Sequence, residues 1–183
     1  MGRVIVFCRR YEDVTRIYLY MKSRLGQEMF DPIGAPNLVK YRLLDMFTAC
    51  THTSVKDAIV AAFTDGSSPL RIVIATIALG MGLNCPDIRM AIHWGPPDSI
   101  ETYLQETGRA GRDGKPSRAV LYHEKTDLKP EYIQAEMKSY CKDTETCRRK
   151  LLLKDFETPE SDDFCTVGCE CCDVCSVKCQ CEK

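Results

Sequence analysis

The sequence contains no run of about 18 consecutive apolar residues, the length that a membrane-spanning helix needs. It also lacks an excess of charge of either sign, because 25 basic residues stand against 26 acidic ones. A net charge of −1 excludes attraction of nucleic acid by the chain as a whole, so such a contact requires a local patch. Residues 1–7 read as a strand, and no cleavable signal is expected. We therefore expect an intracellular protein without a membrane partner.

Two patterns that nucleotide hydrolysis requires are also missing. The sequence has no Gly-x-x-x-x-Gly-Lys-Ser/Thr phosphate loop, and it has no acidic pair of the kind that holds the metal ion of such a site. These residues are therefore not expected to hydrolyse a nucleotide by themselves.

Histidine is scarce, whereas cysteine is abundant and unevenly placed. Eight of the 12 cysteines lie from Cys147 onward. An intracellular protein uses such an excess more often for metal than for disulfides, so the tail is a zinc candidate. Composition is otherwise that of a globular protein, with 44% hydrophobic and 28% charged residues, and the length allows one core with a small appendage.

Short, continuous apolar runs are the candidates for buried strands, at residues 4–7, 72–75, 90–93 and 119–122. Strands that alternate with helices along a chain predict an α/β fold, a mainly parallel sheet flanked by helices on both faces. Ligands in such sheets bind beyond the carboxyl ends of the strands. We therefore expect the loops that follow the strands to form the functional site.

Helices are predicted between these strands from apolar residues at helical spacing. Ser54 is the expected cap of the second helix. Asp98, with Glu101 three residues later, has the form of a capping box that opens a helix over about residues 99–107. Several glycines and prolines interrupt residues 25–51, to which we assign no regular structure.

The pattern changes beyond Pro130. Two helical stretches, over residues 132–140 and 146–156, precede an acidic linker and the cysteine-rich tail. We expect a first domain of residues 1–126 and a second, small helical domain of residues 127–183.

Residues 105–114 contain three glycines and two arginines at the end of a predicted helix. Glycines permit backbone turns with positive φ, and two guanidinium groups from one loop can neutralise charge that develops on a transferred phosphoryl group. The plainer alternative is a helix end whose arginines lie in solvent.

This decapeptide closely resembles motif VI of superfamily 2 helicases, in the form of the RecQ proteins, which begins with Gln. The resemblance implies a RecA-like fold. It also implies that Arg112 is an arginine finger for the γ-phosphate of ATP. Arg109 would be a second phosphate or coupling contact, and Gln105 would link the nucleotide and DNA sites.

Two further segments resemble the same proteins. Residues 4–9 are similar to motif IV, and residues 72–89 are similar to motif V, a strand that runs into a Gly-x-Gly loop. The second resemblance implies that Thr76, Gly80 and Gly82 contact a DNA phosphate, with the Thr76 hydroxyl and backbone amide as donors.

The sequence departs from the RecQ pattern at two places. Asn84 stands where these proteins usually have an acidic residue, so a charge expected to aid coupling between the motor domains is missing. Residues 25–51 lack the expected His-Ala-Gly-Leu run, so the DNA contact made there by the family is not transferred to this chain.

Cys147 lies on a predicted helix, and Cys169, Cys172 and Cys175 follow at close spacing on a loop. Four thiolates can close a tetrahedral zinc site. The arrangement resembles the zinc-binding domain that follows the motor in RecQ helicases, which implies a structural zinc ion. The surplus cysteines are alternative ligands, a second site or free thiols, and free thiols are favoured: Cys165, Cys171, Cys179 and Cys181.

The resemblance as a whole implies a 3′–5′ DNA helicase that acts in recombination, repair or replication. ATP and Mg²⁺ would bind between this region and a first motor domain that these residues do not contain. Arg148 and Arg149 are candidate contacts to DNA phosphates, or else solvated helix residues. We expect a nuclear protein if the source is eukaryotic, and a cytoplasmic one otherwise. The alternatives are a DNA-binding or interaction module without ATPase activity, and a metal-buffering or redox protein.

Overall fold

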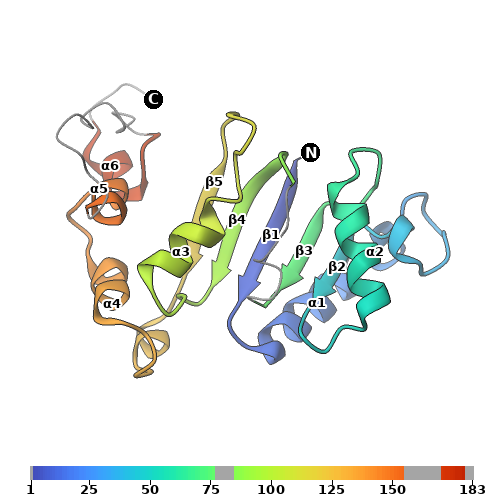
Figure 1. Cartoon of the computed structure of the whole chain (residues 1–183), viewed down its shortest axis with the longest axis horizontal. Coiled ribbons are helices and arrows are strands. Elements are labelled where there is room, and N and C mark those ends of the chain that lie inside the picture. Colours follow the sequence, from blue (N-terminus) through green and yellow to red (C-terminus); the bar gives the residue numbers. More distant parts are fainter. Residues whose placement is uncertain (1, 77–84, 155–169, 180–183) are drawn as a thin grey trace.

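A computed structural model describes residues 2–76, 85–154 and 170–179. Its centre is a five-stranded sheet in the order β2-β3-β1-β4-β5, and every neighbouring pair is parallel (Figure 1). The strands are β1 (Arg3–Cys8), β2 (Leu44–Phe47), β3 (Ile72–Ala75), β4 (Ile88–Trp94) and β5 (Arg118–Tyr122). The predicted α/β class with a parallel sheet is confirmed.

Helices cover both faces of the sheet because the central strand β1 is apolar on both sides. Ile5 and Phe7 face the core that includes helix α2 (Thr53–Thr64). Val6 and Cys8 alternate with them and face the core of helix α1 (Tyr11–Leu25). Successive side chains of a strand point to opposite faces, so one continuous apolar run supplies two cores.

The stretch left without structure in the sequence analysis contains the edge strand β2 and two short 3₁₀ helices, η1 (Gly26–Met29) and η2 (Val39–Tyr41). Strand β2 is only four residues long and includes an acidic residue, Asp45, which weakens its strand signal. Asp45 is buried, and its Oδ2 accepts a hydrogen bond from the Arg42 guanidinium at 2.7 Å.

The C-terminal elements pack on helix α3 (Ile100–Thr107) and on Leu121 of the edge strand β5. After η4 (Lys125–Leu128) come α4 (Ala135–Lys142), α5 (Arg148–Leu153) and α6 (Asp173–Lys178). The rings of Tyr103 on α3 and Tyr140 on α4 lie 5.6 Å apart between their centroids. Within the described residues, no helix has the length and apolarity to cross a membrane.

Two helix caps differ from the sequence prediction by one or two positions. Helix α3 is capped by Ser99, whose Oγ accepts the Thr102 N–H at 3.1 Å, so the prediction of Asp98 was wrong. Helix α2 is capped by His52, whose Nδ1 accepts the Ser54 N–H at 3.3 Å. Neighbouring residues can all supply a capping acceptor, and the turn of the chain decides which one reaches the free N–H groups.

The Ser99 cap gives a direct test of the α3 geometry. We expect Ser99→Ala to lower the free energy of unfolding by about 1 kcal/mol, because one helix-terminal N–H loses its acceptor. Asp98→Ala is the matched control, and its cost should be smaller. Urea unfolding followed by circular dichroism measures both, and a larger cost for Asp98→Ala would contradict the assignment.

Candidate metal centre and arginine loop

Four cysteine sulfurs converge where α5 and α6 begin. They belong to Cys147, Cys171, Cys172 and Cys175, and all four lie within 4.8 Å of one another. The Cys147 sulfur lies 3.6 Å from that of Cys171 and 4.0 Å from that of Cys172. Sulfurs bound at about 2.3 Å to a tetrahedral zinc ion are about 3.8 Å apart, so both the donor type and the spacing fit zinc.

The cluster contains three of the four cysteines predicted as ligands. Cys169 lies outside the described residues, as do the surplus cysteines Cys165 and Cys181. The fourth sulfur in the structure is that of Cys171, which the sequence analysis expected to be a free thiol. The CxxC spacing of Cys169 and Cys172 favoured Cys169, and no local pattern indicated Cys171, which is adjacent to Cys172.

Backbone N–H groups at the starts of α5 and α6 point at sulfurs of the cluster. They favour the thiolate of Cys147, whereas hydrogen bonds to Cys172 and Cys147 raise the pKa of Cys175 to about 11. The Arg148 and Cys175 amides each donate to the Cys172 sulfur at 3.4 Å. Burial raises the pKa of Cys147, but the Lys150 and Arg149 amides and the Cys171 thiol outweigh it and lower the pKa to about 6. A thiolate is the form of cysteine that binds zinc, so Cys147 is ready for metal near neutral pH.

Arg148 ties the cysteine cluster to α4. Its guanidinium donates to both carboxylate oxygens of Asp173 at 3.0 Å, and to the backbone carbonyls of Tyr140 at 2.9 Å and Asp143 at 2.6 Å. The Arg148 guanidinium, a candidate contact to DNA phosphates in the sequence analysis, is therefore already bonded to acceptors of the protein. Arg149, by contrast, is exposed. A DNA contact of either arginine stays a prediction.

The arginine loop follows α3 and precedes β5. The Gly111 N–H donates to the carbonyl of Ile88, the first residue of β4, at 3.0 Å, and the Arg89 guanidinium pairs with Asp113. The loop therefore lies toward the amino ends of the strands. The expectation that functional loops lie beyond the carboxyl ends of the strands is wrong for the arginine loop. A connection from a helix to the next parallel strand must return to that edge of the sheet.

Gly111 is required for the shape of the loop. Its φ is +72°, a conformation that side chains disfavour, and a Cβ atom there would lie 2.5 Å from the Ser117 hydroxyl. The loop therefore folds back tightly toward β5.

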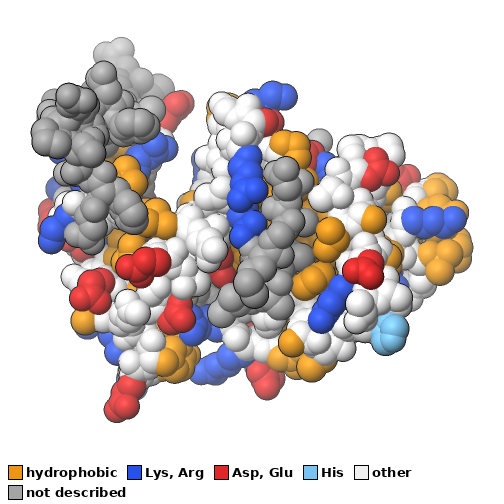
Figure 2. Space-filling model, in the orientation of Figure 1, with side chains coloured by type: hydrophobic (Ala, Val, Ile, Leu, Met, Phe, Trp, Pro, Cys, Tyr) orange, Lys and Arg blue, Asp and Glu red, His pale blue; other side chains and the backbone are white. Residues whose placement is uncertain are grey.

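The two arginines of the loop have different environments. Arg112 is exposed, and its Nε donates to the Gly108 carbonyl at 3.3 Å. Arg109 is only 6% exposed; burial lowers its pKa, the like charge of Arg112 lowers it further, and the Glu106 carboxylate raises it. Gln105 is exposed on α3. On the face of the molecule drawn in Figure 2, Lys and Arg side chains gather in a column near the middle.

Thr76 lies at the carboxyl ends of the strands, opposite the arginine loop, and directly follows β3. Its backbone N–H donates to the Phe47 carbonyl at 3.2 Å, which leaves the hydroxyl as its donor for a phosphate. Gly80, Gly82 and Asn84 lie outside the described residues.

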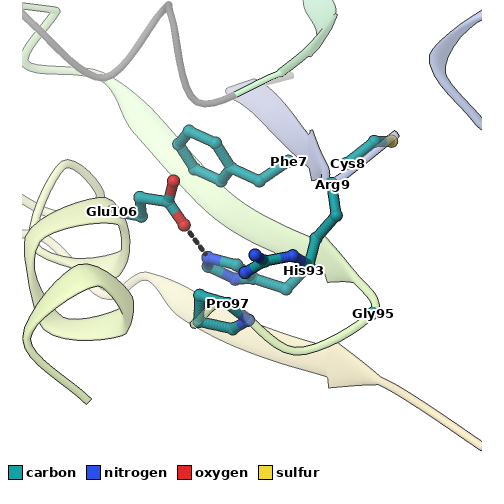
Figure 3. A pocket seen from close by; sticks show the side chains of 7 residues that line it. All are labelled: Phe7, Cys8, Arg9, His93, Gly95, Pro97 and Glu106. Carbon is teal, nitrogen blue, oxygen red and sulfur yellow. Dashed lines mark hydrogen bonds and ion pairs between the residues drawn. The ribbon is translucent and has the colours of Figure 1, made fainter. Parts of the chain in front are cut away.

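The structure reveals one buried ionisable pair that the sequence analysis missed. His93 on β4 and Glu106 on α3 are joined through Nε2 and Oε2 at 2.7 Å (Figure 3). Neither residue was a candidate in the sequence analysis, which noted only that histidine is scarce. Glu106 was passed over although it lies inside the arginine decapeptide, and that position was the available signal.

The chain matches two known domain families. The helicase conserved C-terminal domain covers residues 1–114, and the RecQ zinc-binding domain covers residues 123–176. The ATP-dependent DNA helicase RecQ of Haemophilus influenzae is 34% identical over 190 aligned residues, which cover 90% of this chain and 29% of that protein. This chain thus spans less than a third of the length of that relative.

Solved structures share the fold of this chain. The C-terminal domain of the DEAD-box protein Dbp5 superimposes with a TM-score of 0.55 and 21% identity, over 78% of this chain and 72% of that chain. The helicase Lhr of Mycobacterium smegmatis gives a TM-score of 0.56 and 24% identity, over 69% of this chain and 16% of that chain. Both comparisons support the RecA-like fold.

The parallel sheet and the matched helicase domain define the class of the protein: it contains the second RecA-like domain of a superfamily 2 helicase. The zinc-binding match and the RecQ relatives then give the family. The chain belongs to the RecQ helicases, of which it is a C-terminal region.

Zinc content tests the cysteine cluster. We expect one zinc ion per chain, and its loss in Cys147→Ser and Cys172→Ser, because three thiolates close the site poorly. Elemental analysis of protein purified under reducing conditions measures the content. Cys50→Ser is the matched control, since Cys50 is exposed and outside the cluster, and it should keep the metal.

Comparing Cys169→Ser with Cys171→Ser identifies the fourth ligand. Retention of zinc by both Cys147→Ser and Cys172→Ser would contradict the site. More than one zinc ion per chain would favour a metal-buffering protein.

Arg148 should stabilise the C-terminal helices. We expect Arg148→Ala to lower the free energy of unfolding of the zinc-loaded chain by about 1.5–3 kcal/mol, because charge-assisted hydrogen bonds are lost. The exposed neighbour gives the control, and Arg149→Ala should cost less than about 0.5 kcal/mol. Equal effects of the two variants in urea unfolding would contradict the tie to α4.

The same pair predicts a pH dependence. Hydrogen bonds from Arg148 lower the pKa of the Asp173 carboxyl. The stability from the pair is therefore full above the ordinary Asp value of about 3.9, and it is lost as the pH falls through the lower folded value. The difference in unfolding free energy between the wild type and Arg148→Ala should shrink over that range.

Proposed function

We propose that this chain is the second motor domain and the zinc-binding domain of an ATP-dependent 3′–5′ DNA helicase. Residues 1–126 would form the motor domain and residues 127–183 the zinc-binding domain. A first motor domain would supply the phosphate loop and the metal-holding acids, with ATP and Mg²⁺ between the two domains. We further propose a role in recombination, repair or replication, in the nucleus of a eukaryote or the cytoplasm of a bacterium.

The arginine loop is the observation that supports this proposal most strongly. Arg112 is exposed on a loop that is anchored to β4 at Gly111, so its guanidinium is held on a rigid base and is free to reach a phosphate on a facing domain. In phosphoryl transfer such an arginine neutralises charge that develops in the transition state. Arg112 is the proposed finger, and the buried Arg109 is the proposed coupling residue.

DNA contacts are proposed for the carboxyl ends of the strands, opposite the arginine loop. The Thr76 hydroxyl lies at the carboxyl end of β3, and Gln105, proposed to link the nucleotide and DNA sites, is exposed on α3. The superimposed Lhr structure holds single-stranded DNA and the nucleotide analogue AMP-PNP, which supports both ligands for this fold. Gly80, Gly82, Arg148 and Arg149 complete the proposed DNA contacts.

The cysteine cluster is proposed to hold a structural zinc ion. Cys147 at the start of α5 and Cys171, Cys172 and Cys175 at the start of α6 would hold the ion, which would cross-link the two helices, while Arg148 connects the same helices to α4. The Tyr103–Tyr140 contact then joins the zinc domain to α3, the helix from which the arginine loop emerges. A zinc domain placed in this way would restrict the motion of α3 and so of the loop that carries Arg112.

The proposed activity is tested by joining this chain to the first motor domain of the Haemophilus influenzae RecQ helicase. We expect DNA-stimulated ATP hydrolysis, and a loss of about 10³-fold in kcat for Arg112→Ala, the lower range for arginine fingers. Arg118→Ala is the control, because Arg118 is also exposed but lies on β5, outside the loop. It should keep the wild-type rate.

Two outcomes would change the proposal. DNA binding without ATP hydrolysis in the joined protein would favour the DNA-binding or interaction module. Strand displacement on partial duplexes with a 5′ but not a 3′ single-stranded tail would contradict the proposed direction.

A further inference from the structure

Two large aromatic side chains lie exposed at the carboxyl ends of neighbouring strands. Trp94 is the last residue of β4 and Tyr122 is the last residue of β5, and the two are partners in the parallel register. Their exposed fractions are 49% and 56%. Single exposed apolar residues are common on protein surfaces, whereas an adjacent pair of large aromatic rings forms a contact patch.

The geometry of the pair leaves ring faces open. The centroids of the two rings lie 6.2 Å apart, and the ring planes are tilted by 51°. Two rings stacked face to face would each cover one face of the other, which this tilted pair does not do. A third flat ring can therefore stack on the outer face of either side chain.

The patch lies on the side of the sheet that carries α1, away from α3. The register sets Trp94 beside Cys8, which faces the core of α1, whereas the preceding His93 contacts Tyr103 of α3 on the opposite face. Helix α1 packs over β1, β2 and β3. Within residues 2–76, 85–154 and 170–179, the ends of β4 and β5 thus stay open on this face.

The patch is within reach of the proposed DNA contact at Thr76. Thr76 follows β3, and only β1 lies between β3 and β4 in the sheet. Neighbouring strands are about 4.8 Å apart, so the ends of β3 and β4 are separated by about 10 Å. Three nucleotides at about 3.4 Å each span that distance. A single strand that contacts Thr76 can therefore also reach Trp94.

Positive charge lies beside the patch. The guanidinium of Arg9, in the loop after β1, donates to the carbonyl of Pro96 at 3.3 Å and lies 4.7 Å from the centroid of the Tyr132 ring. Arg10 follows it and is exposed, as is the acidic residue nearest to the patch along β5, Glu124. The two arginines suit a phosphate backbone that passes beside stacked bases.

The size of the patch favours a nucleobase over a protein partner. A fully buried tryptophan or tyrosine covers about 150–250 Å². Two such side chains, already half covered, offer far less than the roughly 800 Å² per partner of a stable protein interface. A flat base needs only one ring face, and every base has a face that can stack.

We propose that Trp94 and Tyr122 form a stacking site for the bases of single-stranded DNA. The inference deepens the proposed function, on which it rests for the identity of the ligand. Because stacking uses the faces of the bases rather than their edges, the site would hold the strand without reading its sequence.

Trp94 is the only tryptophan of the sequence, so its fluorescence reports on this site alone. We expect single-stranded oligothymidine of about 12 nucleotides, a length within the range of single-strand sites, to quench that fluorescence. An abasic strand of the same length keeps the phosphates but lacks the bases, and it should leave the fluorescence unchanged. Equal quenching by the two strands would overturn the inference.

The affinity for labelled oligothymidine, measured by fluorescence anisotropy at low salt, gives the second test. We expect Trp94→Ala to raise Kd about tenfold and Tyr122→Ala to raise it in the same direction, because a stacking surface is lost. Trp94→Phe keeps a ring and should stay within about threefold of the wild type. Tyr20→Ala is the matched control, since Tyr20 is 67% exposed on α1 but outside the patch, and its Kd should not change.

The outcomes separate this inference from the proposed function. An unchanged Kd in Trp94→Ala overturns the stacking site, as does a wild-type chain that binds no oligothymidine, and DNA-stimulated ATP hydrolysis by the joined motor then still tests the proposed function. Self-association that Trp94→Ala abolishes, with DNA affinity unchanged, would assign the patch to a second copy of the chain. If Trp94→Ala fails to fold, Tyr122→Ala and the quenching measurement decide.

Discussion

The parallel pairing of β1 with β4 is the constraint on which the candidate sites depend. Its register places Phe7 beside His93 and Cys8 beside Trp94, so the two strands end together. The loop after β1 then reaches the C-terminal region, where the Arg9 guanidinium donates to the Pro96 carbonyl and lies over the Tyr132 ring. A shift of the register by one residue would turn His93 away from α3 and separate it from Glu106.

Helix α3 connects the arginine loop to the C-terminal helices. Its start is fixed by the Ser99 cap beside β4, its buried face contacts His93 and Tyr140, and its end leads into the arginine loop. The C-terminal helices α4 and α5 therefore pack against the helix that precedes Arg112. Such packing offers a physical path from the C-terminal helices to the arginine loop, because closely packed elements transmit displacement.

The cysteine cluster shows how a short, polar segment acquires structure. Few of its residues are apolar enough to form a core, and its order depends on the sulfurs, on the N–H groups at two helix starts and on Arg148. Metal binding would replace the missing core, because thiolate ligands brought together by zinc stabilise the folded form directly.

The sequence alone determined the α/β class, four of the five strands, the zinc-type tail and the arginine loop, because each rests on local periodicity or on residue types at fixed spacing. Tertiary structure alone decided that Asp45 lies in an edge strand, that Ser99 rather than Asp98 caps α3, and that Cys171 joins the cluster. It also decided that Arg148 binds Asp173 and that His93 meets Glu106. These contacts join residues from different elements, and local patterns cannot encode which elements the folded sheet brings together.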